Sequence, residues 1–415
     1  MSMIGLMDCN NFFVSCERLF RPDLEGVPVA VLSSNDGCVV ARSQEVKDLG
    51  IAMGVPLFQV KGICTKEKVT LFSGNITLYR DISSRVMQTL AQEVGECEIY
   101  SIDEAFFSLP NDVTEADVHA IRDKVMKNVG IPVSIGVART KTLAKQASSI
   151  GKKSDGVCIL TQEDWQERAK EVKCGEIWGL GRQTTTKLSE QGVKMVAEYM
   201  ALNRGLVSQL YGVSGERIYD ELHGVSVVQI ERNSEDSRKS IASTRSFAKT
   251  TKNLVDLESA VAGHVNHCAE NLRKRGVVTS KIHVQLQTDR YGDFFMQGDS
   301  TEILLEKPTA ETSVLLKETL KQVQKMYCDD VPYKKTGVTF SGLMPESYIT
   351  GTLFGQEEKK SSGILDTVID GMNERFGRGT IHSGSILNNR ARSNAQLRSK
   401  FYTTQWKDIP TVSAK

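Results

Sequence analysis

The sequence predicts a multi-domain α+β protein. Its 415 residues exceed what one hydrophobic core usually organises. Short apolar runs at residues 3–7 and 105–109 are typical of buried strands, and helical patterns separate them. Residues 167–232 are predicted to be helical, and residues 240–345 return to an order of strand, helix and strand. Regions of different pattern therefore follow one another along the chain.

The first region, residues 1–20 and 76–166, is predicted to form one α/β layer. Residues 132–138 alternate well enough to form a further strand in that layer. A helix capped by Thr140 is expected to follow, and it should end before Lys152. The positive end of this helix and the lysines of its first turn could then act together on a phosphate.

Three carboxylates are predicted to meet at one edge of this layer. Asp8 follows the first apolar run, and Asp103 and Glu104 precede the run at 105–109. If the two strands pair, these like charges are unfavourable unless cations lie between them. Oxygen ligands without nearby His or Cys favour Mg²⁺, and two such ions can hold the attacking and leaving oxygens of a phosphoryl transfer. The alternative, a solvated Asp-Glu turn, fits poorly with the apolar flanks.

The helical region contains a glycine turn that is typical of a helix-hairpin-helix. The turn is Gly179-Leu180-Gly181, and Lys187 follows it. Backbone N–H groups at a helix start after such a turn are suited to a DNA phosphate. An ordinary helical hairpin with a glycine turn is the alternative.

The region after residue 240 is predicted to combine strands with an amphipathic helix. Residues 256–275 place apolar side chains on one helical face, and residues 282–287 and 337–340 have the pattern of strands. From residue 346 the chain becomes polar and glycine-rich, so we expect a flexible tail with short ordered pieces.

The net charge of +1 hides a strong segregation of basic residues. Residues 139–153, 238–252 and 375–407 contain repeated Lys and Arg and no Asp or Glu. Clustered cations that face phosphates release counterions and give sequence-independent affinity for DNA. For any one stretch, a solvated charged surface is the alternative. The residues that we expect to bind DNA are Lys141, Lys145, Gly179, Gly181, Lys187, Arg245 and Lys249.

The cysteines indicate a reducing compartment. There are nine of them, scattered and without a Cys-x-x-Cys pair, which favours free thiols over disulfides or a zinc site. We also expect no membrane segment and no signal peptide, because no apolar run is long enough for a bilayer and the start lacks a basic leader. Together these features predict a cytoplasmic protein.

Two motifs resemble those of the Y-family translesion DNA polymerases. They are Asp8-Cys9-Asn10-Asn11-Phe12-Phe13-Val14-Ser15-Cys16-Glu17 and, about a hundred residues on, Ser101-Ile102-Asp103-Glu104-Ala105-Phe106. Further segments resemble the UmuC branch of that family, the catalytic subunits of bacterial DNA polymerase V. These segments are residues 20–24, 34–42, 140–145, 177–182 and 377–380. The resemblance covers essentially the whole chain, in the order of the family.

The resemblance implies a right-hand polymerase fold with four domains and a tail. The palm would be α/β, the fingers small, the thumb helical with the helix-hairpin-helix, and the little finger α+β. The implied boundaries are 1–20 and 76–166 for the palm, 21–75 for the fingers, 167–232 for the thumb, 240–345 for the little finger and 346–415 for a flexible tail that binds partners.

The resemblance also assigns roles to residues. Asp8 and Asp103 would bridge two Mg²⁺ ions, Glu104 would complete the site, and the Cys9 carbonyl would bind the ion on the nucleotide side. The remaining residues are expected at the nucleotide: Phe12, Phe13, Lys47 and Lys152. The two lysines would approach the triphosphate, and Phe13 would be the steric gate under the sugar 2′-position. Core packing is the alternative for both phenylalanines.

The implied function is error-prone translesion DNA synthesis in SOS mutagenesis and DNA damage tolerance. The implied partners are primed damaged DNA, deoxynucleoside triphosphates, a processed dimer of UmuD type, a RecA filament and the replication sliding clamp. Leu353 and Phe354 keep the apolar anchors of the clamp-binding peptide.

Two other classes stay open: a metal-dependent DNA nuclease and an inactive DNA-damage scaffold. Lys47 and Lys152 favour a triphosphate pocket over a nuclease, and the intact Asp8, Asp103 and Glu104 argue against a scaffold.

Overall fold

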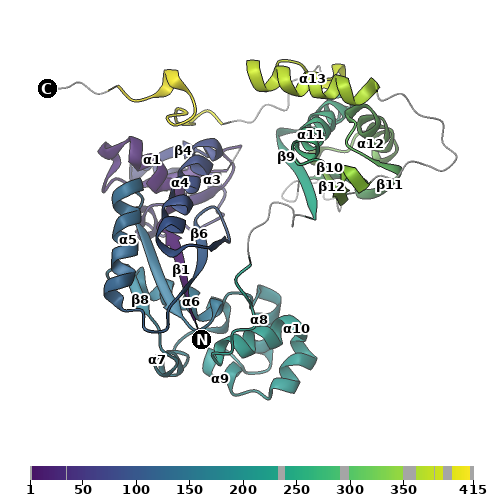
Figure 1. Cartoon of the computed structure of the whole chain (residues 1–415). Coiled ribbons are helices and arrows are strands. Elements are labelled where there is room, and N and C mark those ends of the chain that lie inside the picture. The colour runs from purple at the N-terminus through teal and green to yellow at the C-terminus, as the bar shows by residue number, and fades with distance from the viewer. Residues whose placement is uncertain are drawn as a thin grey trace. The chain divides into compact units, whose positions relative to one another are not determined.

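The computed structural model describes residues 2–33, 35–231, 239–289, 299–348, 361–377, 379–386 and 395–411. The chain forms two compact units. The first unit combines Met1–Ser234 with Ala395–Lys415, and the second unit is Glu235–Asn394 (Figure 1). All nine cysteines are free thiols, as expected.

The first unit is built on a five-stranded sheet with the order β5-β6-β1-β7-β8. The strands are β1 Met3–Cys9, β5 Cys97–Ile99, β6 Glu104–Leu109, β7 Val133–Ala138 and β8 Val157–Ile159. Strand β1 lies between β6 and β7 and is antiparallel to both, whereas β7 and β8 are parallel. The strands predicted at residues 3–7, 105–109 and 132–138 are therefore confirmed.

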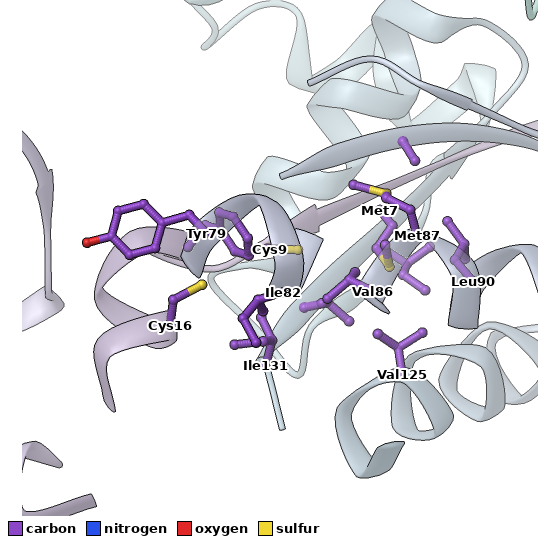
Figure 2. Close-up of a cluster of buried hydrophobic side chains, with 14 of the residues drawn as sticks. Met7, Cys9, Cys16, Tyr79, Ile82, Val86, Met87, Leu90, Val125 and Ile131 are labelled. Atoms are coloured by element: carbon purple, nitrogen blue, oxygen red, sulfur yellow. The ribbon is translucent and has the colours of Figure 1, made fainter. Parts of the chain in front are cut away.

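Helices cover both faces of this sheet. On one face lies a core cluster shared by the sheet with α1 Phe12–Phe20, α4 Ile76–Val94 and α5 Glu115–Val129. Figure 2 shows part of it, with Val86 and Leu90 of α4 among the labelled side chains. On the other face lies α6 Lys141–Gly151, whose N-terminal cap Thr140 accepts from the Leu143 N–H as predicted.

The contact between α6 and the sheet is unusually close. A Cβ atom on Gly136 of β7 would lie only 1.9 Å from the backbone nitrogen of Ser148 in α6. Any larger side chain at residue 136 would push the helix away from the sheet. This glycine therefore fixes the distance between α6 and the strands that carry the acidic residues.

A smaller layer of the first unit contains residues 22–73. Its sheet has the order β3-β2-β4, and the layer includes two short α-helices with their own small core. The elements are η1 Pro22–Leu24, β2 Val29–Leu32, β3 Val39–Arg42, α2 Gln44–Asp48, α3 Leu57–Lys66 and β4 Thr70–Ser73.

The rest of the first unit up to Ser234 is mainly helical, as predicted from residue 167 on. Its elements are α7 Gln162–Arg168, η2 Cys174–Glu176, α8 Arg182–Glu190, α9 Val196–Met200 and α10 Arg204–Leu222. Helix α10 is interrupted at Gly212, where φ is +66°. Glu221 near its end accepts from the Thr142 N–H at 3.0 Å, which ties α10 to the start of α6.

The second unit is a four-stranded antiparallel sheet with the order β11-β10-β12-β9. Helices α11 and α12 share a core with it. The elements are β9 Ser240–Thr251, α11 Leu254–Lys274, β10 Val277–Thr288, β11 Asp299–Thr309, α12 Thr312–Met326, β12 Tyr333–Pro345, η4 Glu346–Tyr348, α13 Ser361–Phe376 and η5 Gly384–Ile386. The predicted helix at 256–275 and the strands at 282–287 and 337–340 are confirmed.

The expected flexible tail from residue 346 differs from the structure in two places. Helix α13 is 16 residues long, and Arg273 of α11 forms ion pairs with its Asp366 and Asp370 at 3.3 and 2.7 Å. Residues 395–411, which include η7 Trp406–Asp408, pack on the first unit. Both contacts join residues far apart in sequence, so local composition could not reveal them. The predicted clamp anchors Leu353 and Phe354 lie outside the described residues.

No helix among the described residues has both the length and the apolar character that crossing a membrane requires.

Candidate active site

The pairing of β1 with β6 brings the predicted acidic residues together. Asp8 lies directly opposite Glu104 in the antiparallel register, and the Cys9 N–H donates to the Asp103 carbonyl at 2.9 Å. The side chains of Asp8 and Glu104 are 15% and 18% exposed. The Ser101 hydroxyl donates to Asp103. The three carboxylates therefore gather at one end of the central strands, partly shielded from water.

Two lysines pair with two of the three carboxylates, Asp8 and Glu104. The Lys152 ammonium lies 2.6 Å from Asp8 Oδ1, and the Lys145 ammonium lies 2.9 Å from Glu104 Oε1. Both cations come from one element, because Lys145 is in α6 and Lys152 is its C-terminal cap residue. The position of α6, set by Gly136, therefore determines the charge balance of the site.

The electrostatics of Asp8 show how strongly the site needs positive charge. Burial raises the pKa of Asp8 from 3.8 to about 6; Lys152 opposes that rise, while Glu104 and Asp103 add to it. Even with a lysine in contact, the charged form of Asp8 is disfavoured. A cation of higher charge would relieve this cost.

The donor set fits magnesium in its chemistry. It consists of carboxylate oxygens and, at Cys9, only a main-chain carbonyl, because the Cys9 side chain lies in the apolar cluster of Figure 2. Within the described ranges, no three or more His, Cys, Asp or Glu side chains are already grouped closely enough to hold a metal ion. Asp8 and Glu104 face lysines instead.

A cavity of about 410 Å³ opens beside the carboxylates. Asp8, Glu104, Lys145 and Lys152 line it together with Trp178 of the helical region. The Trp178 indole donates to the Tyr100 hydroxyl at 3.0 Å. The Lys145 ammonium lies 4.7 Å from the Tyr100 ring centroid and 5.5 Å from that of Trp178, within cation–π range.

Sequence reasoning missed Tyr100 and Trp178 as residues of this site. Tyr100 directly precedes the motif that begins at Ser101, and Trp178 lies inside the segment 177–182 that resembles the family. Their aromatic character next to glycine and acidic motifs was the available signal.

The two phenylalanines of the first motif differ in burial, although their ring centroids are 5.9 Å apart and both contact the same core cluster. Phe12 is 3% exposed and belongs to the core, so its prediction as a nucleotide-binding residue is corrected to core packing. Phe13 is half-buried and stacks on Tyr79 of α4, with ring centroids 4.4 Å apart and an interplanar angle of 16°. Asn11 precedes them in a left-handed conformation with φ of 49°, which turns the chain from β1 into α1.

Lys47 contacts the turn at Asn11 between β1 and α1. Its ammonium, on α2, donates to Asn11 Oδ1 at 2.7 Å. Burial lowers the pKa of Lys47, and Arg42 and Lys152 lower it further. Arg42 and Lys152 therefore both act on Lys47, and Lys47 and Lys152 also interact with Asp8; such a group of cations attracts a polyanion.

The predicted DNA-binding residues fall into different surroundings. Lys141 is 2% exposed and paired with Glu98, so its prediction as a DNA contact is corrected to a buried ion pair. Lys145 faces Glu104 in the active site. The remaining predicted residues are accessible: Gly179, where φ is +94°, Gly181 at the cap of α8, Lys187 on α8, and Arg245 and Lys249 on the sheet-edge strand β9.

Comparison with a solved structure defines the class of fold. The structure is similar to the Y-family DNA polymerase chimera Dbh-Dpo4(243-245)-Dbh, with a TM-score of 0.70 and 19% identity, over 83% of this chain and 99% of that chain. The chain thus has the fold of a Y-family DNA polymerase, as the sequence predicted.

Sequence comparisons define the branch. Residues 7–149 match the impB/mucB/samB family, residues 238–353 match the impB/mucB/samB family C-terminal domain, and residues 364–412 match a domain of unknown function (DUF4113). The chain is 33% identical to Protein UmuC of Salmonella typhimurium, over 99% of this chain and all of that protein. It is 30% identical to Protein MucB of Escherichia coli over the full length of both. It is 25% identical to DNA polymerase IV of Desulfatibacillum aliphaticivorans, over 95% and 99%. The chain belongs to the impB/mucB/samB family of UmuC-type Y-family polymerases.

Proposed function

We propose that this protein is an error-prone translesion DNA polymerase of SOS mutagenesis and DNA damage tolerance, which adds deoxynucleotides to a primer 3′ end. The observation that carries the proposal is the register of Asp8 opposite Glu104, with Lys152 and Lys47 beside them. Carboxylates for metal ions next to cations for a triphosphate are the two parts that nucleotidyl transfer needs. Membership of the UmuC-type family supports the same reaction.

The residues divide the chemistry as follows. Two Mg²⁺ ions, when bound, would lower the pKa of the primer hydroxyl and neutralise the triphosphate and the leaving pyrophosphate. Asp8 and Asp103 would hold both ions, with Glu104 and the Cys9 carbonyl completing the donor set. Lys152 and Lys47 would bind the triphosphate. For this, Lys152 would exchange its present ion pair with Asp8 for a contact with a phosphate oxygen. Phe13 would exclude ribonucleotides through contact with the sugar 2′-position.

The domains would have the roles of a right hand. The five-stranded sheet would be the palm, residues 21–75 the fingers, residues 167–232 the thumb and residues 240–345 the little finger. DNA contacts would come from the Gly179–Gly181 turn, Lys187, Arg245 and Lys249. Within the turn, the Leu180 and Gly181 N–H groups already donate to the carbonyls of Ile177 and Gly179, so the main-chain donors for a phosphate would be those of the first turn of α8, which has no side-chain cap. The three cations are exposed. Within the tail, residues 353 and 354 would bind the sliding clamp.

The partners would be those of the family. Damaged primed DNA and deoxynucleoside triphosphates are the substrates, and a UmuD-type processed dimer and a RecA filament would activate synthesis in the cytoplasm. Primer extension by the purified chain, measured with and without these two partners, tests whether they activate synthesis.

One assay separates the polymerase from the nuclease and the scaffold. The purified chain receives a 5′-labelled primer on a template, four deoxynucleotides and Mg²⁺, and the products are resolved by length. Extension of the labelled primer supports the proposal, and shortening of the primer indicates a nuclease. DNA binding with neither change in length indicates a scaffold. Asp103→Asn should abolish extension and retain DNA affinity, because it removes a metal ligand and no phosphate contact. Extension by Asp103→Asn at the parent rate would refute the site.

A further inference from the structure

The last described segment of the chain returns to the first unit. Residues 395–411, here called the C-terminal strap, follow residues of the second unit but pack beside β4. The Ser73 N–H donates to the Leu397 carbonyl at 3.0 Å, and the Leu397 N–H donates to the Ser73 hydroxyl at 2.9 Å. The strap therefore forms one parallel bridge at the β4 edge of the small sheet.

A single buried amide joins the strap to α4. Asn75 Nδ2 donates to the carbonyls of Ser399 and Lys400 at 3.3 and 3.2 Å, and to the Ser399 hydroxyl at 3.0 Å. Its Oδ1 accepts from the Leu78 N–H and so caps α4. The same residue thus positions the helix that carries Tyr79 and holds the strap.

The strap also reaches a buried carboxyl group. Glu17 of α1 is fully buried, and its Oε1 accepts from the Ser399 hydroxyl at 3.0 Å and from the Tyr79 hydroxyl at 2.6 Å. Its Oε2 has no hydrogen-bond partner among the described residues. Because a buried carboxyl group is costly when its partners are lost, Ser399 contributes directly to holding Glu17 in place.

Tyr79 connects this carboxyl group to the nucleotide site. Its hydroxyl points away from the apolar cluster in Figure 2, toward Glu17, while its ring stacks on Phe13. Four side chains therefore form a continuous series of contacts, here called the gate relay: Ser399, Glu17, Tyr79 and Phe13.

We propose that the C-terminal strap positions Phe13 and thereby sets sugar discrimination. A steric gate works by repulsion, so it discriminates only if the gating ring cannot recede from the sugar. Tyr79 backs the Phe13 ring, Glu17 fixes the far end of Tyr79, and Ser399 fixes Glu17. Ser399 and Asn75 are positioning residues that touch no substrate. The proposal rests on the proposed role of Phe13 as the gate.

The proposed positioning of Phe13 gives a role to residues 395–411, which are part of the segment 364–412 that matches a domain of unknown function. The competing role is that the strap only protects the β4 edge and adds stability. An edge-protecting strap would leave the ratio of deoxyribonucleotide to ribonucleotide use unchanged.

The test measures kcat/KM for matched deoxyribonucleotides and ribonucleotides on a primed template, with the full chain. Ser399→Ala should lower discrimination roughly threefold to tenfold, the effect of one lost hydrogen bond to a buried acid. Thr404→Ala is the matched control, because it removes an exposed hydroxyl from the same strap and should not change the ratio. Asn75→Ala is a second variant, and hydrogen exchange over residues 395–411 reports whether it releases the strap.

A double-mutant cycle then separates the gate from the strap. Phe13→Ala should lower discrimination more than Ser399→Ala does, and Ser399→Ala should add nothing in the Phe13→Ala background, because both act through one ring. An equal effect of Ser399→Ala in both backgrounds would overturn the proposal. If Phe13→Ala relaxes discrimination while Ser399→Ala and Asn75→Ala do not, the strap proposal fails and the gate stands. If Phe13→Ala changes nothing, the gate assignment itself is wrong and the gate relay falls with it.

Discussion

Asp8→Asn should make the metal-free protein more stable while removing its activity. Raising the pKa of Asp8 from 3.8 to about 6 costs its charged form about 3 kcal/mol, chiefly through burial. The neutral amide avoids that cost and can still accept from Lys152. We expect the free energy of unfolding of the first unit to rise by about 1–3 kcal/mol at pH 8 in the presence of EDTA.

The sign of this effect depends on pH. Because the pKa of Asp8 is higher in the folded state, the folded chain binds the proton more tightly than the unfolded chain. The cost is absent below pH 3.8, grows as pH rises through the window up to about 6, and is complete above it. The advantage of Asp8→Asn should therefore be largest at pH 7–8 and vanish toward pH 4.

Urea unfolding followed by tryptophan fluorescence measures this effect in the first unit alone. All three tryptophans, Trp165, Trp178 and Trp406, belong to that unit, and Trp165 is fully buried. Mg²⁺ should stabilise the parent and have little effect on Asp8→Asn. Asp81→Asn, which breaks an exposed ion pair with Arg85, is the control and should change stability little. An Asp8→Asn protein less stable than the parent in EDTA at pH 8 would refute the reasoning.

Three further predictions concern other parts of the chain. Gly136→Ala should cost about 3 kcal/mol of stability in urea unfolding because it forces α6 from the sheet, whereas Gly62→Ala, inside α3 where the added Cβ meets nothing within 4 Å, should stabilise by about 0.5–1 kcal/mol. Burial lowers the pKa of His264 to about 4, and the charges of Arg245 and His267 add to this effect. The free energy of unfolding of the second unit should therefore fall by about 3 kcal/mol as the pH falls from 6.5 through 4. An equal loss of stability in His264→Gln would contradict this. Replacing Leu353 and Phe354 with Ala should lower clamp-stimulated synthesis and spare the basal rate on short primers; equal stimulation would exclude this peptide as the contact.

The sequence predicted the elements that depend on local pattern. The strands of Asp8 and Glu104 follow from apolar runs, and the start of α6 follows from the cap at Thr140. These signals are local, because burial of a run and capping of a helix involve neighbouring residues. The metal-ligand candidates could therefore be named before the fold was known.

Side-chain direction and long-range pairing were beyond such reasoning. Phe12 and Phe13 begin α1 about 100° apart around its axis, so Phe12 enters the core while Phe13 is half-buried against Tyr79, a difference that depends on where the helix lies. Lys141 is buried because Glu98, 43 residues earlier, meets it in the fold. A charge in sequence predicts a solvated cation until such a partner is known.

The candidate active site and the gate relay have one kind of interaction in common. In both, a shielded carboxyl group accepts from a donor on a distant segment: the partly buried Asp8 from Lys152 after α6, and the fully buried Glu17 from Ser399 of the strap. A buried acid is expensive to leave without a partner, so each pair fixes the two segments relative to one another. At Asp8 the partner can be exchanged, because metal ions can replace an ammonium group. At Glu17 it cannot, because the site is closed to water and its donors are hydroxyl groups. The first pair could therefore change when substrate binds, whereas the second would keep Tyr79 in place behind Phe13, as the proposed sugar discrimination requires.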